Sequence, residues 1–258
     1  MIERTPRVVL TVAGTDSGGA AGVAADLTTF AGLGAHGASA VTAVTAQDTT
    51  GVRAVHQVPV EMVAAQVDAV LDDLPVTAVK TGMLGSAAVV ALVADRFGGR
   101  RMPLVVDPVL VATSGAVLGD EDVAAAYVSL LLPVASVVTP NLDEARALVG
   151  GDGPPEALAQ ALADHGPAVV LTGGGTSGGC TDWVVVRGEE PVALTHPAVE
   201  TTSDHGTGCT FSAALAVHLG HGVPLAIAAR RAATYTVAQL RLSQDWQLGH
   251  GRGPIAHI

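Results

Sequence analysis

The chain alternates between short, unbroken runs of apolar residues and longer segments whose apolar residues recur at helical spacing. Unbroken runs are typical of strands buried on both faces, whereas apolar residues three and four apart form one face of a helix. We predict strands at residues 8–13, 37–46, 52–58, 76–80, 104–106, 136–139 and 168–171. We predict helices at residues 20–33, 60–74, 86–97, 120–131, 141–148 and 224–243, with one more after residue 155 and one ending near residue 217.

Strands that alternate with helices imply an α/β fold, with a mostly parallel central sheet covered by helices on both faces. Residues 180–187 and 191–196 are the exception, because they form a predicted hairpin around Gly188-Glu189 and therefore an antiparallel edge. No internal repeat or low-complexity linker marks a second domain, so we expect residues 1–258 to form one domain. Such sheets bind ligands at the carboxyl ends of their strands, and the loops that follow the strands should share one rim.

Composition narrows the classes of function. Apolar residues make up 49% of the chain, enough for a buried core, while aromatic residues at 3% are too few to stack single-stranded nucleic acid. A formal net charge of −11 without a basic run argues against nucleic acid or anionic membranes as partners. Two cysteines, no signal-peptide pattern and no apolar run near the roughly 20 residues that span a bilayer lead us to expect a cytoplasmic protein.

One glycine-rich stretch, His205-Gly206-Thr207-Gly208-Cys209-Thr210, leads directly into a helical pattern. The first turn of a helix presents unpaired backbone N–H groups at the positive end of the helix dipole, and glycine lets an anion approach them. We therefore predict an anion site suited to phosphate, formed by Gly206, Thr207 and Gly208. A thiol at a helix start should have a lowered pKa, which makes Cys209 a candidate reactive group. The alternative is a glycine cap with Cys209 as a small core residue.

Several nucleotide and metal motifs are absent. A P-loop needs Gly-Lys-Ser/Thr, but the single lysine of the chain, Lys80, follows Val79, so P-loop kinases are excluded. A G-x-G-x-x-G pattern occurs at Gly173, Gly175 and Gly178, yet a predicted strand follows it where a dinucleotide site requires a helix. The nine histidines show no close metal-ligand spacing, and two distant cysteines cannot form a zinc knuckle.

Acidic and amide groups remain on the predicted rim, namely Asp16, Asp26, Gln47, Asp107, Asn141 and Glu144. Asn141 and Glu144 are three residues apart at a helix start, so they face the same side and could hold a hydrated Mg²⁺ against phosphate. Helix capping explains the same pair, and a strand-end cap explains Asp107. Gln47 offers one acceptor and two donors to the edge of a heterocycle, or is simply solvated.

The motifs together resemble one family. They are Ala13-Gly14-Thr15-Asp16-Ser17-Gly18-Gly19-Ala20-Ala21-Gly22, Ala25-Asp26-Leu27, Thr42-Ala43-Val44-Thr45-Ala46-Gln47-Asp48-Thr49-Thr50-Gly51-Val52, Lys80-Thr81-Gly82-Met83-Leu84, Asp107-Pro108-Val109, Thr139-Pro140-Asn141-Leu142-Asp143-Glu144-Ala145, the stretch from His205 to Thr210, and Gly249-His250-Gly251-Arg252-Gly253-Pro254. The chain thereby resembles hydroxymethylpyrimidine/phosphomethylpyrimidine kinase of thiamine biosynthesis, in the ribokinase-like superfamily. The motifs cover nearly the whole chain in order.

The resemblance implies a ribokinase-like α/β/α sandwich and two ATP-dependent phosphorylations. The first would modify 4-amino-5-hydroxymethyl-2-methylpyrimidine on its hydroxymethyl oxygen, and the second would give the diphosphate. It implies Gly14, Asp26, Gln47 and Met83 at the pyrimidine and Cys209 as the base. It also implies a group near Mg-ATP, namely Asn141, Glu144, Asp107 and Thr172, in which Glu144 and Asp107 would hold Mg²⁺ through water. Members of the family usually form dimers.

One position departs from the family pattern. Where the family commonly has Lys-Gly-Gly-His, this chain has Thr172-Gly173-Gly174-Gly175, so a lysine that would touch the triphosphate is missing. Thr172 could bond a phosphate oxygen, and Arg187 could supply charge. Two alternatives follow: a pyridoxal kinase of the same superfamily, which the amide of Gln47 disfavours, and a non-catalytic pyrimidine-binding sensor, which the intact stretch from His205 to Thr210 disfavours.

Overall fold

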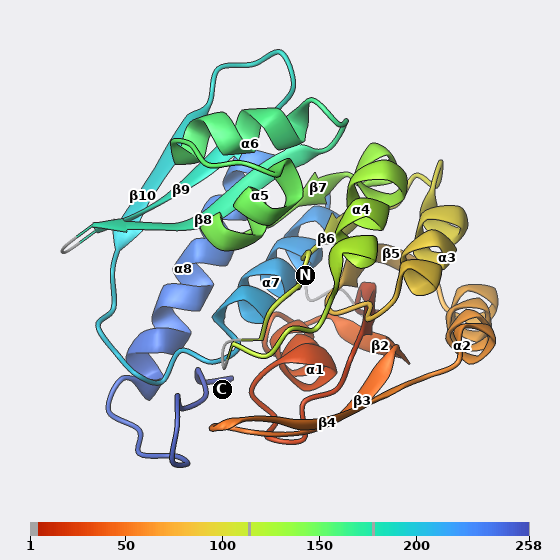
Figure 1. Ribbon diagram of the computed structural model, residues 1–258, viewed down its shortest axis with the longest axis horizontal. Helices are drawn as coiled ribbons and strands as arrows, with labels where there is room; N and C mark the ends of the chain where they lie inside the picture. The colour runs from red at the N-terminus through yellow and green to blue at the C-terminus, as the bar shows by residue number, and fades with distance from the viewer. Residues whose placement is uncertain (1–4, 113–114, 177–178, 258) are drawn as a thin grey trace.

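The computed structural model describes residues 5–112, 115–176 and 179–257. Within these residues the main sheet contains β1 (Val8–Ala13), β2 (His36–Val41), β5 (Val76–Thr81), β6 (Leu104–Val106), β7 (Val137–Val138), β8 (Ala168–Thr176), β9 (Gly179–Val185) and β10 (Val192–Pro197). The strand order is β10-β9-β8-β7-β6-β5-β1-β2, parallel from β8 to β2 and antiparallel at the β8-β9-β10 edge (Figure 1). The predicted mostly parallel sheet with an antiparallel edge hairpin is confirmed.

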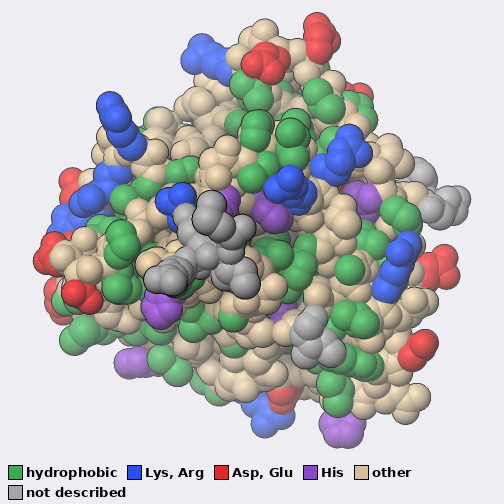
Figure 2. Space-filling view, turned by 180° about the vertical axis from the view of Figure 1, so that it is seen from behind, with side chains coloured by type: hydrophobic (Ala, Val, Ile, Leu, Met, Phe, Trp, Pro, Cys, Tyr) green, Lys and Arg blue, Asp and Glu red, His purple; other side chains and the backbone are tan. Residues whose placement is uncertain are grey.

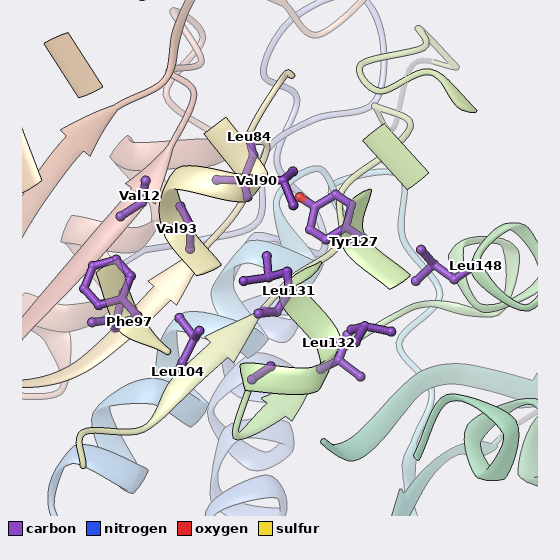
Figure 3. Close-up of a cluster of buried hydrophobic side chains, with 14 of the residues drawn as sticks. Val12, Leu84, Val90, Val93, Phe97, Leu104, Tyr127, Leu131, Leu132 and Leu148 are labelled. Carbon is purple, nitrogen blue, oxygen red and sulfur yellow. The ribbon is translucent and has the colours of Figure 1, made fainter. Parts of the chain in front are cut away.

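Helices cover both faces of the sheet and enclose two cores. The first core lies under α2 (Val60–Asp73), α3 (Ala87–Phe97), α4 (Glu121–Ala126), α5 (Leu142–Val149) and α6 (Pro155–Ala163), and the second under α1 (Gly22–Gly32), α7 (Thr207–Gly220) and α8 (Leu225–Ser243). Successive strand residues point to opposite faces, so Leu10 and Val12 enter the first core and Val9 the second. Figure 3 shows the first core, where Phe97 and Leu131 pack together with the sheet residue Leu104.

The predicted strand at residues 37–46 is wrong as a single element. It is divided at Thr42 into β2, which joins the main sheet, and β3 (Ala43–Asp48), which pairs with β4 (Gly51–Gln57) in a separate two-stranded sheet. Thr42 is buried, its amide donates to the Ala13 carbonyl and its Oγ1 donates to the Met83 carbonyl at 2.7 Å. These long-range bonds turn the chain without any glycine or proline, so the apolar pattern contains no signal of the break.

Two further boundaries differ from the prediction. The helix expected at residues 120–131 is α-helical only to Ala126 and continues as a π-helical turn (Tyr127–Leu131) and a 3₁₀ turn (Leu132–Val134). The strand predicted at residues 168–171 is longer in the structure, where it continues to Thr176 because β9 pairs with it in an antiparallel ladder. The ladder is irregular between Leu171 and Gly174, and this bulge turns Thr172 toward the rim.

Charged side chains of both signs are dispersed over the surface, with Lys and Arg also over the centre of the face in Figure 2. On the face opposite to that of Figure 1, acidic side chains lie mainly toward the margin, among hydrophobic and uncharged groups (Figure 2). Among the described residues, no helix has the length and apolar character needed to cross a membrane.

Candidate active site

A cavity lies at the carboxyl ends of the parallel strands, where the N-terminus of α7 meets the loops that follow β1, β5, β6 and β7. Its lining includes every predicted site residue except Asp26, namely Gly14, Gln47, Met83, Asp107, Asn141, Glu144, Thr172, Gly206, Thr207, Gly208 and Cys209. Val109, Val111, Ala112 and Leu118 add an apolar wall. The topology thus brings together side chains that are up to about two hundred positions apart in sequence, as the carboxyl-end rule predicts.

The N-terminus of α7 has the geometry of an anion site. Gly206 precedes the helix with φ at 93°, and a Cβ there would overlap the carbonyl oxygen of Ala20, so only glycine fits. Thr207 Oγ1 donates to the Asp204 carbonyl at 2.6 Å and fixes the entry into the helix. Gly208 and Cys209 follow in the first turn, whose amides have no carbonyl partner within the helix, and both residues line the cavity.

Cys209 differs from the prediction in its acidity. Burial raises the pKa of the Cys209 thiol to about 12, and the nearby carboxylates of Asp107 and Asp26 act in the same direction. The positive charge of Lys80 and a hydrogen bond from the Gly22 amide oppose this rise without cancelling it. The predicted lowering of the pKa is therefore wrong for the unliganded site, because burial and two carboxylates outweigh the helix start. The thiol is protonated at neutral pH.

Asp26 and Lys80 form a buried ion pair behind the cavity. Both side chains are fully buried, and Lys80 Nζ lies 2.8 Å and 3.0 Å from the two carboxylate oxygens of Asp26. Thr11 Oγ1 donates a further hydrogen bond to Asp26 at 2.6 Å, and Lys80 Nζ lies 3.8 Å from Asp107. Burial alone would lower the pKa of Lys80, but the charge of Asp26 raises it. The structure does not bring Asp26 to the cavity wall, which corrects its predicted position at the substrate.

The side of the cavity formed by β1 and β3 carries groups that are already paired within the protein. Asp16 accepts hydrogen bonds from the amides of Gly18, Ala20 and Ala21 and from His205 Nε2, which is 3.1 Å away. Burial alone would raise the pKa of Asp16, but these hydrogen bonds lower it. Gln47 Nε2 lies 3.1 Å from the same nitrogen of His205, which is itself buried, so the amide lies beside the imidazole at the cavity.

Met83 and Gly14 form an apolar surface next to Gln47. A Cβ at Gly14 would overlap the terminal methyl group of Met83, so the thioether lies where a larger residue would displace it. The Gly14 amide also donates to the Met83 carbonyl at 3.1 Å. A flat apolar surface beside an amide is suited to a heterocycle that presents donors and acceptors on one edge.

The opposite side of the cavity carries two buried carboxylates, Asp107 and Glu144. Burial and the charge of Asp107 raise the pKa of Glu144 to about 8, and burial likewise raises the pKa of Asp107 despite the charge of Lys80. Ser212 Oγ donates to Asp107 at 2.9 Å. Two neighbouring carboxylates repel each other when both are ionised. A cation bound between them would relieve that repulsion, so the pair is suited to bind one.

Glu144 and Asn141 also form a capping box at the start of α5. The Glu144 amide donates to Asn141 Oδ1 and the Asn141 amide donates to Glu144 Oε2, both at 2.9 Å. The capping interpretation and the ligand interpretation are therefore compatible, since each side chain keeps one polar atom outside the cap. Beside them, Thr172 lines the cavity from the bulge of β8, with its amide bonded to the Pro140 carbonyl.

Sequence reasoning assigned no role to Lys80, His205 or Ser212. Lys80 had a detectable signal, since a lysine inside an apolar strand requires a buried anionic partner. His205 and Ser212 had none, because their partners Asp16 and Asp107 are more than one hundred residues away along the chain.

Solved structures with the same fold define the class of protein. A pyridoxal kinase from Bacillus subtilis in an ADP complex superposes with a TM-score of 0.89 at 31% identity, covering 98% of both chains. A phosphomethylpyrimidine kinase from Clostridium difficile superposes with a TM-score of 0.77 at 31% identity, covering 90% of this chain and 98% of its own. The fold is that of the ribokinase-like small-molecule kinases.

Sequence relatives define the family within that class. Residues 16–256 match the family described as phosphomethylpyrimidine kinase. The hydroxymethylpyrimidine/phosphomethylpyrimidine kinase of Rhizobium meliloti is 47% identical over 261 residues and covers 97% of each chain. The protein of the same name from Streptomyces coelicolor is 43% identical over 98% of this chain and 95% of its own. The chain belongs to the phosphomethylpyrimidine kinase family.

Proposed function

We propose that the protein is an ATP-dependent kinase of thiamine biosynthesis that phosphorylates 4-amino-5-hydroxymethyl-2-methylpyrimidine and then its monophosphate. Family membership supports the reaction, and several relatives carry both activities in their names. The observation that carries the proposal is a single cavity in which an amide and an apolar surface face two carboxylates across the N-terminus of α7. Phosphoryl transfer depends mainly on such positioning and on electrostatic stabilisation.

The acceptor pyrimidine is proposed to lie between Gln47 and Met83. The Gln47 amide offers both a donor and an acceptor to the aminopyrimidine edge, and it lies beside the imidazole of His205. The hydroxymethyl group would then point toward Cys209. Pyridoxal is the competing acceptor, since solved structures of the same fold include a pyridoxal kinase in complex with pyridoxal.

The donor is proposed to be ATP, with its phosphates between the first turn of α7 and the carboxylates of Asp107 and Glu144. The raised pKa values of these two groups fit a divalent cation, because a cation would stabilise both ionised forms. Mg²⁺ would supply positive charge to the phosphates when it is bound. The hydroxyl group of Thr172 can donate a hydrogen bond to a phosphate oxygen. It stands at the position where the family commonly has a lysine.

Cys209 is proposed to take the proton of the acceptor alcohol at Sγ in the first transfer. The thiol would first lose its own proton to solvent, and a bound cation that neutralises the charge of Asp107 would favour this loss by lowering the pKa of Cys209. The amides of Gly208 and Cys209 would stabilise the charge on the transferring phosphoryl group. The second acceptor is a phosphate monoester, whose second pKa is about 6, so it needs no base.

We also propose a homodimer in which a second copy covers β3-β4 and the adjacent part of α2. Val44 and Val55 lie on opposite faces of this ribbon and are 51% and 42% exposed, and Met62 of α2 is 54% exposed, so a second copy could bury apolar surface here. Light scattering coupled to gel filtration should give twice the chain mass, and Val55→Glu should reduce it to the monomer mass. A monomer in the wild type would contradict the proposal.

A product assay tests the proposed reaction. Purified protein with Mg-ATP and either hydroxymethylpyrimidine or pyridoxal is followed over time by mass spectrometry. We expect pyrimidine monophosphate and then diphosphate, with pyridoxal phosphate as a minor product at most. Dominant pyridoxal phosphate would assign the protein to pyridoxal phosphorylation, and no product from either acceptor would support a binding protein without catalysis.

A further inference from the structure

A cluster of three potential metal ligands lies on the antiparallel edge of the sheet, apart from the cavity residues. Cys180 and Asp182 belong to β9 and His196 to β10, and their ligand atoms lie within 4.8 Å of one another. We propose that Cys180, Asp182 and His196 bind a borderline divalent metal ion of the Zn²⁺ class.

Strand register brings the three side chains to one face of the hairpin. Cys180 and His196 are directly opposed in the antiparallel β9-β10 ladder, and Asp182 is two residues from Cys180 on the same strand. Opposed residues and residues two apart point to the same side of a sheet, so the three side chains converge without any loop. Ligands on regular strands are held more rigidly than ligands on loops.

The contacts of His196 orient its ring with Nε2 toward the other two ligands and Nδ1 toward a backbone carbonyl. Its Nδ1 lies 3.3 Å from the Pro197 carbonyl, which can only accept, so Nδ1 carries a hydrogen. Its Nε2 faces the cluster and lies 3.1 Å from Asp182 Oδ2, a carboxylate oxygen that accepts the Nε2 hydrogen; a metal ion would take the place of that hydrogen. Ligating histidines usually donate their other nitrogen to a carbonyl or carboxylate in this way.

Asp182 is oriented by a comparable second contact. Its Oδ1 accepts a hydrogen bond from the Gly173 amide at 3.1 Å, which leaves Oδ2 directed at His196 and Cys180. Asp182 is buried, while Cys180 and His196 are partly exposed, so solvent and ions can reach the cluster from one side. The carboxylate of Asp182 is thus held by the Gly173 amide at Oδ1, while Oδ2 faces the other two ligands.

The donor set selects the class of metal. Thiolate, imidazole and carboxylate together suit Zn²⁺ and Co²⁺, whereas Mg²⁺ prefers oxygen ligands alone. Zinc bond lengths of about 2.0 Å to nitrogen and 2.3 Å to sulfur place tetrahedral ligand atoms about 3.5 Å apart. The distance of 3.1 Å between His196 Nε2 and Asp182 Oδ2 is near this value, and all three ligand atoms lie within 4.8 Å of one another, so small side-chain movements would complete the site. Three protein ligands leave the fourth position to water.

The test uses Co²⁺ as a spectroscopic probe, in the presence of excess Mg²⁺ to occupy oxygen-ligand sites. Wild-type protein should develop a thiolate-to-cobalt charge-transfer band and tetrahedral d–d bands, and Zn²⁺ should remove both by displacement. The chain has two cysteines, so Cys209→Ser is a matched control that should keep the bands, whereas Cys180→Ser should lose the charge-transfer band. His196→Ala should weaken Co²⁺ binding by about 10- to 100-fold, and His36→Ala should not.

Thermal unfolding separates metal binding from a folding defect. Zn²⁺ should raise the melting temperature of the wild type and of Cys209→Ser but not that of Cys180→Ser, whose metal-free melting temperature should match the wild type. Absence of the charge-transfer band in the wild type would overturn the proposal. So would its persistence in Cys180→Ser, or its loss in Cys209→Ser alone, which would assign the metal to the catalytic cavity.

Discussion

The two sides of the cavity carry acidic groups in opposite states. On the β1-β3 side, Asp16 is held by three backbone amides and His205, and these bonds lower its pKa. On the β6-α5 side, burial raises the pKa values of Asp107 and Glu144. The charge of Asp107 raises the pKa of Glu144 further. We therefore propose that the β1-β3 side is complete within the protein, whereas the β6-α5 side is completed by a cation that comes with the phosphate donor.

Cys209 lies between the two sides, and its removal should have the largest effect. Cys209→Ala should slow the first transfer by about 10²- to 10⁴-fold, because general-base catalysis contributes that much to proton transfer from an alcohol. The second transfer should slow by less than about 10-fold, since a phosphate monoester is already ionised. Single-turnover rates measured from each acceptor separately give the two values. Equal losses would show that Cys209 positions groups without moving a proton.

The acidic side should make the metal-free protein sensitive to pH. Glu144 has a pKa of about 8 in the folded protein and about 4.5 when unfolded, so between these values the folded state binds more protons. The free energy of unfolding of the protein should therefore fall by on the order of 3 kcal/mol as pH rises from about 5 to 8. Urea unfolding at several pH values measures this fall.

Mg-ATP and Glu144→Gln provide the controls for the pH prediction. Both should make the free energy of unfolding depend less on pH, because Mg-ATP compensates the charge of the Glu144 carboxylate and Glu144→Gln removes it. The neighbouring Asp143 is exposed, so Asp143→Asn is a matched variant that should leave the slope nearly unchanged. A slope that survives in Glu144→Gln would assign the effect to another group.

Gln47→Leu should affect the acceptor alone. Loss of one hydrogen-bonding amide leaves a polar edge of the pyrimidine unpaired, at a cost of about 1–3 kcal/mol. We expect kcat/KM for hydroxymethylpyrimidine to fall by about 10- to 100-fold, with little change in the KM for ATP. A variant that shifts the KM for ATP and spares the acceptor would reverse the assignment of the two sides.

Thr172→Lys should give the smallest change. A lysine at the bulge of β8 would add one positive charge near the proposed phosphates, worth about 1 kcal/mol in a partly exposed site. We expect the KM for ATP to decrease by about 5-fold, with the acceptor KM unchanged. An increase would show that the bulge cannot accommodate the longer side chain.

Much of this arrangement could be predicted from the chain itself. Unbroken apolar runs such as residues 8–13 identify parallel strands, and the carboxyl-end rule then places Gly14, Met83 and Asp107 on one rim. The glycines around Thr207 likewise predict a helix start at the cavity. These features are local, since each depends on residues that are neighbours in sequence.

The features that could not be predicted depend on tertiary contacts. The break at Thr42 is made by bonds to Ala13 and Met83, and the acidity of Cys209 is set by burial beside Asp107. Asp26 belongs to a recognised motif, yet its partner Lys80 draws it behind the cavity wall. A motif therefore identifies residues at and behind the cavity without distinguishing those on its wall from those that lie behind it.

The most direct test of the two-sided cavity is to measure, in Glu144→Gln, the Mg²⁺ concentration for half-maximal rate and the KM for hydroxymethylpyrimidine. We predict that the Mg²⁺ requirement rises by about 10- to 100-fold in both transfers, while the acceptor KM stays within about 2-fold of the wild type. A raised acceptor KM with an unchanged Mg²⁺ requirement would show that the carboxylates serve the pyrimidine and that the two sides are wrongly assigned.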